Sequence, residues 1–300
     1  MKISFFIPLA ALLLAPIARA APDTPSPIAP GAALQKLAGG FSFTEGPACD
    51  ARGNVFFTDQ PNDRIMEWSV AGKLSVFLSP CGRSNGLCFG RAGDLWACAD
   101  EQNQLWRITP AGKVTVVLKD GGGKLLNGPN DVWMRPDGGL YLTDPFYKRD
   151  YWKRGPMEQP GQSVFFLAPD HQTLRAVATD LTQPNGIIGT PDGKTLYVSD
   201  IGAGRTYAYG IQKDGSLSDK HLFCTLGSDG MTIDSEGNVY LTGHGVTIFD
   251  KAGHQVAHIP VAEDWTGNVC FGGTDRRTLF ITASKGLYAL WMRTRGVGSQ

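Results

Sequence analysis

One pattern recurs six times along the chain: a short apolar run, a turn rich in polar residues and glycine, and a second apolar run. Its clearest copy spans residues 127–144, where Pro136-Asp-Gly-Gly139 separates two strand-like segments and predicts a β-hairpin. The six copies close at equivalent points, namely Asp59, Asp100, Asp144, Asp200, Gly243 and Ala283. The intervals between these closing positions are 41, 44, 56, 43 and 40 residues.

A period of about 40–50 residues, with several short strands in each unit, is typical of propeller blades. Helical repeats of similar length would place apolar residues at a spacing of 3.6, whereas these runs alternate at two. The sequence therefore predicts an all-β fold, a six-bladed β-propeller. The 38 glycines and 19 prolines supply the many turns that such a chain of 300 residues needs.

The first 20 residues have the composition of a secretory signal peptide, with Lys2, a short apolar core and a small-residue end that predicts cleavage before Ala21. The apolar run is too short for a membrane span and contains two prolines. We therefore expect export, to the periplasm or outside the cell. Residues 21–33 contain four prolines and are expected to form a linker, which leaves 34–300 for the propeller.

Within that domain, residues 34–43 are the candidate for a terminal strand that completes the last blade. The mature chain carries 26 basic and 28 acidic residues, a balance that argues against nucleic acid or an anionic membrane as a partner. Of the six cysteines, Cys81 and Cys88 form the one pair worth suspecting of a disulfide, while Cys49, Cys98 and Cys270 lie in apolar runs that predict buried thiols. No Cys/His cluster suggests zinc.

A side chain bearing oxygen stands 14 or 15 residues before each closing position. The six are Glu45, Asn85, Asn130, Asn185, Asp229 and Asn268. Because the first strand of each blade lines the central channel of a propeller, we expect these equivalent groups to converge on the axis. Oxygen ligands with two carboxylates and no sulfur or imidazole favour a hard cation, with calcium ahead of other divalent ions. The alternative is that these residues merely initiate turns.

The strand directions place further groups at the same mouth. The carboxylates that close the first four blades, Asp144 among them, should lie near it, although solvated strand ends are the preferred explanation for them. The long interval after Asp144 predicts a loop, 145–160, that overhangs the cation. Tyr147 and the basic residues of that loop could pack on a sugar-like ring and attract an anionic product, or the loop could be simply solvated. His244 is a candidate base at this face or a turn cap.

Four motifs in order, Glu45-Gly-Pro, Asn127-Gly-Pro-Asn-Asp-Val, Gln183-Pro-Asn-Gly-Ile and Ser228-Asp-Gly-Met, resemble the gluconolactonase/regucalcin/luciferin-regenerating-enzyme family. The resemblance implies a calcium-type six-bladed propeller that hydrolyses lactones. It implies that Glu45, Asn185 and Asp229 bind the metal, that Asn130 joins the coordination sphere or contacts substrate, and that Asp229 acts as base. Regucalcin-like members carry an Arg where this chain has Gly128, which leaves sugar specificity open.

The function expected from these features is metal-assisted hydrolysis of a lactone, with D-glucono-1,5-lactone to gluconate as the default reaction. The cation polarises the ring carbonyl, and either Asp229 or the cation activates the attacking water. Asn130, Asp144, Tyr147 and His244 are the candidate substrate contacts. Two alternatives remain at this stage: an arylesterase or organophosphate hydrolase on the same site, and an exported binding propeller with a structural cation.

Overall fold

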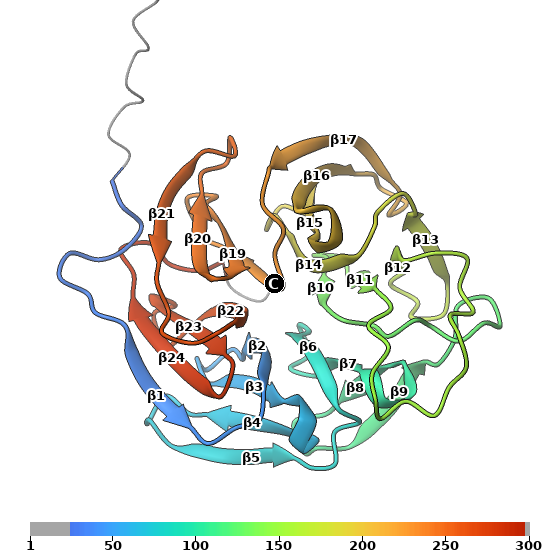
Figure 1. The fold of residues 1–300 in the computed structure, drawn as a ribbon, viewed down its shortest axis with the longest axis horizontal. Helices are drawn as coiled ribbons and strands as arrows, with labels where there is room; N and C mark the ends of the chain where they lie inside the picture. Colours follow the sequence, from blue (N-terminus) through green and yellow to red (C-terminus); the bar gives the residue numbers. More distant parts are fainter. Residues whose placement is uncertain (1–24, 298–300) are drawn as a thin grey trace, which may run out of the picture.

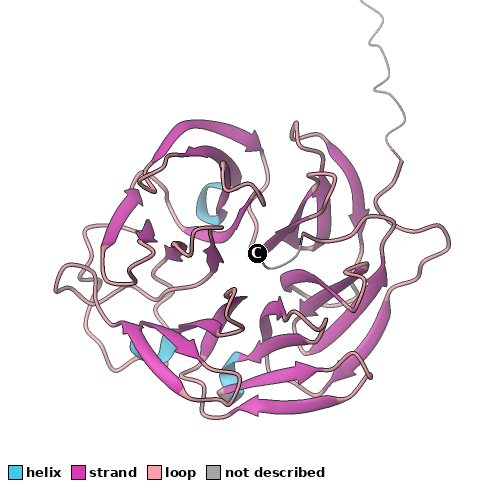
Figure 2. Ribbon diagram, turned by 180° about the vertical axis from the view of Figure 1, so that it is seen from behind, coloured by secondary structure: helices cyan, strands magenta, loops and turns pink. Residues whose placement is uncertain are grey.

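The structure, a computed structural model, describes residues 25–297. The expected signal peptide lies outside the described residues, as does the start of the linker, 21–24. Within the described range, six four-stranded antiparallel sheets stand around a central axis (Figures 1 and 2). The predicted all-β, six-bladed β-propeller is therefore confirmed.

Each sheet begins at the axis with one strand. These innermost strands are β2 (Thr44–Cys49), β6 (Ser84–Phe89), β10 (Val132–Met134), β14 (Pro184–Gly189), β18 (Met231–Ile233) and β22 (Thr266–Gly272). The second strands are β3 (Val55–Asp59), β7 (Leu95–Ala99), β11 (Leu140–Asp144), β15 (Thr195–Asp200), β19 (Val239–Gly243) and β23 (Thr278–Ala283). Hairpin turns at one face of the disc join each first strand to its second strand.

The outer half of each sheet follows the same order. The third strands are β4 (Arg64–Trp68), β8 (Gln104–Ile108), β12 (Ser163–Leu167), β16 (Arg205–Ile211), β20 (Gly245–Phe249) and β24 (Gly286–Trp291). The outermost strands are β5 (Leu74–Leu78), β9 (Val114–Leu118), β13 (Leu174–Ala178), β17 (Leu217–Cys224), β21 (Gln255–Ile259) and β1 (Gln35–Gly39). Three single-turn 3₁₀ helices follow second strands: η1 (Gln60–Asn62), η2 (Asp100–Gln102) and η3 (Ile201–Ala203).

The ring closes through the first strand of the chain. β1 pairs antiparallel with β24, from Gln35 opposite Ala289 to Gly39 opposite Gly286. The expectation that a strand within 34–43 completes the last blade is thus confirmed. The preceding arm also follows this blade, since Ile28 forms a bridge with Met292. Closure of this kind leaves no unpaired edge between the first and last blades.

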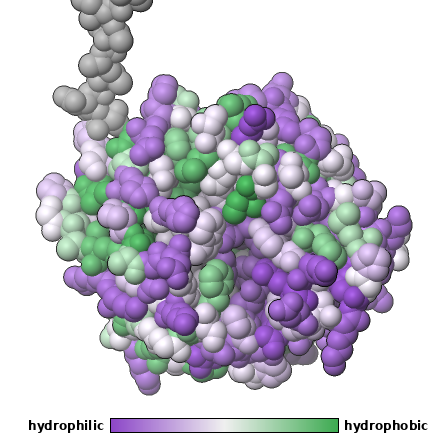
Figure 3. Space-filling view, viewed as in Figure 1, coloured by the Kyte–Doolittle hydropathy of each residue, from purple (hydrophilic) through white to green (hydrophobic). Residues whose placement is uncertain are grey.

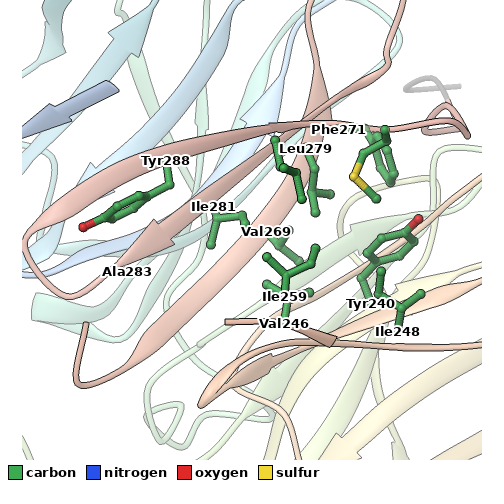
Figure 4. Close-up of a cluster of buried hydrophobic side chains, with 12 residues drawn as sticks. Tyr240, Val246, Ile248, Ile259, Val269, Phe271, Leu279, Ile281, Ala283 and Tyr288 are labelled. Carbon is green, nitrogen blue, oxygen red and sulfur yellow. The ribbon is translucent and has the colours of Figure 1, made fainter. Parts of the chain in front are cut away.

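The core consists of apolar layers between neighbouring blades. β3, β7 and β11 are buried at every position because a neighbouring sheet covers each of their faces, whereas the outermost β5 is partly exposed. Figure 4 shows one such layer, in which Tyr240, Val246 and Ile248 of the fifth blade face Val269 and Ile281 of the sixth. The predicted buried thiols Cys49, Cys98 and Cys270 lie in these layers. Cys81 and Cys88 are free thiols, so the suspected disulfide is absent.

The extra length of the third blade falls where the sequence predicted it. β11 ends at Asp144 and β12 begins at Ser163, whereas only four residues separate β7 from β8. This excursion, 145–162, is the yellow-green loop beside β11 in Figure 1. The space-filling view of the same face shows a hollow near its centre, where the inner strands meet (Figure 3). Across residues 25–297 we find no helix that is both long and apolar enough to span a membrane.

Candidate active site

Five of the six predicted residues occupy equivalent places at the inner end of their blades, around the axis. Glu45, Asn85, Asn130 and Asn185 are buried, and Asp229 is half-buried. Four of the first strands carry a β-bulge here, between Glu45 and Ala48, between Ser84 and Leu87, between Pro184 and Ile187, and between Thr266 and Asn268. A bulge re-aims a side chain out of the regular alternation. We refer to Glu45, Asn85, Asn130, Asn185 and Asp229 as the oxygen ring.

The sixth predicted member, Asn268, does not occupy the equivalent position. Its amide donates to Thr282 Oγ1 over 3.1 Å, as the amide of Gly230 donates to Thr242 Oγ1 over 2.8 Å. Asn268 therefore corresponds to Gly230, one residue after Asp229. The prediction that all six residues are equivalent is wrong in this blade. The hairpin that joins Asn268 to Thr282 is two residues longer than the hairpin that joins Gly230 to Thr242. The sixth place in the ring belongs to Gly267.

Gly267 brings no side chain to that place. A methyl group on Gly267 would lie 2.8 Å from Glu45 Oε1, which is too close for any side chain. Its carbonyl accepts a hydrogen bond from Thr242 Oγ1 over 2.8 Å, matching the bond from Thr58 Oγ1 to the carbonyl of Asn85. The ring therefore has five side chains, and at the sixth place the carboxylate of Glu45 packs against the backbone of Gly267.

A second polar layer lies beneath the oxygen ring. Asp131 and Asn268 are both buried, and Asn268 Nδ2 approaches Asp131 Oδ2 to 3.5 Å across the channel. In the other four blades the corresponding residue is glycine: Gly46, Gly86, Gly186 and Gly230. We call Asp131 and Asn268 the partition, because they close the channel below the ring.

The carboxylate of Asp229 accepts hydrogen bonds from two neighbouring side chains. Trp265 Nε1 donates to its Oδ2 over 2.6 Å, and Asn185 Nδ2 donates to its Oδ1 over 2.7 Å. His244 is exposed and contacts Trp265 edge-on, with ring centroids 5.3 Å apart. Trp265 thus lies between His244 and Asp229. Contact of His244 with a substrate stays a prediction.

The two ring carboxylates lie in an environment that disfavours their charged forms. Burial raises the pKa of Glu45 well above its usual value, and the neighbouring charge of Asp229 adds to this increase. Burial also raises the pKa of Asp229, against the hydrogen bonds from Trp265 and Asn185. A cation bound between the two carboxylates would favour their charged forms and offset this cost.

The donor set fits a hard cation. Asn185 Oδ1 is buried with no hydrogen-bond partner among the described residues, because its Nδ2 already serves Asp229 and Tyr147. Neither Glu45 nor Asp229 forms an ion pair within residues 25–297. That part of the chain has no cluster of three His, Cys, Asp or Glu side chains arranged around a metal. The ring instead combines two carboxylates with three amides, a set suited to calcium.

The strand-end carboxylates are not solvated, contrary to one of the two interpretations of the sequence. Asp144 is fully buried, and its two oxygens accept the backbone amides of Asn127 and Gly128, each over 2.9 Å. Asp59 and Asp200 accept amides of the preceding segment in the same way. Asp144 therefore supports the segment that leads to Asn130, and its contact with a substrate stays a prediction.

Asp100 differs because it lies one residue later than the other three. Asp59 and Asp200 precede η1 and η3, whereas Asp100 is the first residue of η2. Its carboxylate is free to bind side chains of the loop 145–162, and it accepts hydrogen bonds from Arg149 and Tyr151. The sequence pattern aligns Asp100 with the other three carboxylates and so does not reveal this offset of one residue.

The loop reaches the ring through Tyr147. Asn185 Nδ2 donates to Tyr147 Oη over 2.6 Å, so this residue of the predicted overhanging loop contacts the oxygen ring directly. Sequence reasoning missed Trp265 and Asp131, and it included Arg149 only among the basic residues of the loop. Asp131 had a visible signal, since glycine follows the ring residue in four other blades. The position of Trp265, and the choice of Arg149 among the basic residues, depend on how separate segments meet in space.

Known proteins share the fold of this chain and part of its sequence. The chain is 27% identical over 293 residues to a gluconolactonase of Zymomonas mobilis, covering 88% of this chain and 82% of that one. It is 29% identical to the solved gluconolactonase of Xanthomonas campestris, with a TM-score of 0.83 and coverage of 89% and 91%. The calcium-binding regucalcin of Agrobacterium tumefaciens shares the fold, with 20% identity, a TM-score of 0.74 and coverage of 89% and 96%.

The family model described as the SMP-30/Gluconolactonase/LRE-like region matches residues 43–285. That range begins just before Glu45 and includes all five ring residues, both partition residues and the loop 145–162. The expected resemblance is thereby confirmed, and this chain belongs to the SMP-30/gluconolactonase/LRE-like family.

Proposed function

We propose that this protein is a lactonase that hydrolyses D-glucono-1,5-lactone to gluconate with a bound divalent cation, calcium before other ions. The observation that carries the proposal is the oxygen ring, which combines the buried carboxylate of Glu45, the half-buried carboxylate of Asp229 and the unpartnered amide oxygen of Asn185. The gluconolactonase relatives at 27% and 29% identity support lactones as the substrate class.

Glu45, Asn130, Asn185 and Asp229 would hold the cation. When bound, it would act as a Lewis acid on the lactone carbonyl and stabilise the oxyanion that develops there. The sixth place of the ring carries no side chain, because the carboxylate of Glu45 fills the space beside Gly267. An open coordination position on the cation would admit an ester, whereas a purely structural cation is usually enclosed by protein.

Asp229 is the proposed base. Trp265 and Asn185 fix its carboxylate from two sides, and both donors favour the ionised form that can accept a proton. Asp229 takes a proton from water as the water oxygen attacks the carbonyl carbon. The proton then passes to the ring oxygen as the carbon–oxygen bond of the lactone breaks, which yields the hydroxy acid.

The test is to assay purified protein with gluconolactone after chelation and again after adding Ca²⁺. Turnover should disappear with the chelator and return with the ion, while the folded state persists by circular dichroism. Phenyl acetate and a phosphotriester serve as comparison substrates. Undiminished turnover in excess chelator would refute the metal-dependent mechanism, and faster turnover of either comparison substrate would refute the lactone assignment.

We also propose that the chain is exported after cleavage before Ala21, as its first residues suggest. Mass spectrometry of the protein from its native cells should find a mature chain that starts at Ala21. Recovery of chains that begin at Met1, in the cytosolic fraction, would contradict export.

A further inference from the structure

The loop 145–162 is tied down at Asp100, whose side chain is buried. Arg149 Nε donates to Asp100 Oδ2 over 3.2 Å, and the hydroxyl of Tyr151 donates to the same oxygen. Trp152 Nε1 donates to the Asp100 carbonyl over 2.8 Å. Three side chains of one loop thus converge on a single residue of a neighbouring blade, which fixes the path of the loop over the channel mouth.

Gly128 makes this close approach feasible. A methyl group there would lie 2.7 Å from Asp100 Oδ1 and 2.8 Å from Trp152, at a backbone φ of 151° that disfavours other residues. A long side chain at position 128 cannot coexist with this arrangement. Any basic group that serves the site must therefore come from another segment.

Arg149 provides that basic group. Its guanidinium lies 4.8 Å from the centre of the Tyr147 ring, and Tyr147 in turn bonds Asn185 of the oxygen ring. Its charge acts on Glu45 and Asp229 and lowers the pKa of both carboxyl groups. Only Nε is engaged among the described residues, and the side chain is 27% exposed. The two terminal nitrogens remain as donors near the mouth.

Hydrolysis changes the charge of the ligand. A lactone is neutral, whereas the ring-opened hydroxy acid carries a carboxylate. A guanidinium with two unused nitrogens binds a carboxylate strongly, through two parallel charge-assisted hydrogen bonds. The same group gains little from a neutral ester. Arg149 is consequently placed to distinguish product from substrate.

We propose that Arg149 binds the carboxylate of the ring-opened hydroxy acid, and that the loop anchored on Asp100 positions it for that purpose. The proposal rests on the proposed lactonase function for the identity of the ligand. It assigns the loop a role in retaining and releasing the anionic product, in addition to any covering of the site.

The experiment measures gluconate binding by calorimetry and gluconolactone turnover by kinetics, for the wild type and for Arg149→Gln. Gluconate affinity should fall roughly 10- to 100-fold, the range for losing a charge-assisted hydrogen bond. The KM for gluconolactone should change by less than about threefold, because the neutral lactone makes no such bond. Arg149→Lys should retain part of the gluconate affinity.

Two control variants separate charge at this position from other effects. Lys153→Gln removes an exposed positive charge from the same loop and should leave gluconate affinity unchanged. Tyr151→Phe weakens the anchor on Asp100 while keeping Arg149, and should retain the preference for the anion. Unchanged gluconate affinity in Arg149→Gln, or an equal loss for gluconate and gluconolactone, would overturn the proposal.

These measurements distinguish failure of the binding role of Arg149 from failure of the proposed lactonase function. A wild-type protein that binds gluconate through Arg149 yet does not hydrolyse gluconolactone would refute the lactonase and support the binding role. A working lactonase in which Arg149→Gln binds gluconate normally would refute the binding role alone.

Discussion

The two halves of the central channel are built by the same six strands and differ in chemistry. Above the partition, the oxygen ring presents carboxylates and amides. Below it lies a cavity of about 140 Å³, lined by apolar residues such as Leu87 and Val132, by three cysteines and by Val297 near the C-terminus. Asp131 and Asn268 line this cavity as well, whereas none of the five ring residues does. The boundary is therefore a single layer thick.

This difference shows that the position of a residue along the first strand of its blade decides which kind of side chain lines the channel there. At the layer of the partition, four glycines make room for two polar side chains. A methyl group at Gly230 would lie 1.9 Å from Asn268 Cγ, and one at Gly86 would lie 2.5 Å from Asp131 Oδ1. One residue earlier the side chains bear oxygen, and one residue later they are mostly apolar. The proposed chemistry is thus assigned to one end of the propeller.

The largest effect should come from the ring carboxylates. Asp229→Asn and Glu45→Gln should each reduce turnover of gluconolactone by about 10²- to 10⁴-fold, because each removes charge from the proposed cation site and Asp229→Asn also removes the base. In chelator, the same variants should be more stable than the wild type by roughly 1–3 kcal/mol, since a buried uncompensated carboxyl is costly. Steady-state kinetics and urea unfolding measure the two quantities.

The opposite signs for activity and stability identify a functional site. Glu101→Gln, which removes an exposed carboxylate, serves as control and should change neither quantity appreciably. If Glu45→Gln destabilised the chelated protein as much as it impaired turnover, the carboxylate would be a structural group and the contrast between the two halves would lose its meaning.

Much of this contrast was predictable from the sequence. The sixfold period gave the propeller, and the oxygen residue before each hairpin gave five ring members. The assignment of Asn268 failed because counting residues assumes hairpins of equal length, and the hairpin before Thr282 is longer. Asp100 was misaligned for a similar reason, since β7 ends one residue before it. Trp265 and Arg149 depend on contacts between segments, which no local pattern encodes.

A smaller effect is expected at the partition. Gly230→Ala should destabilise the protein by about 1–3 kcal/mol, the usual range for overpacking a filled core, because the new methyl group overlaps Asn268. Gly161→Ala is the matched control, since a methyl group there meets nothing within 4 Å. Urea unfolding of both variants measures the difference. Equal stability of the two variants would mean that the partition yields easily and does not separate the halves.

The smallest effect should come from the cavity below the partition. Cys270 lies there, and burial raises the pKa of its thiol well above the usual value, so it stays neutral and takes no part in proton transfer. Cys270→Ala should cost about 1 kcal/mol of stability through lost packing. Its kcat and KM for gluconolactone should stay within about twofold of the wild type, because the partition separates it from the ring.

Thiol reagents provide an independent measurement of the same half. In the native protein Cys270 should react slowly with a thiol-specific disulfide reagent, and unfolding in urea should make it react at the rate of a free peptide thiol. Rapid native labelling of Cys270, or a Cys270→Ala variant with strongly altered turnover, would show that events below the partition reach the oxygen ring. The channel would then have to be treated as one continuous site.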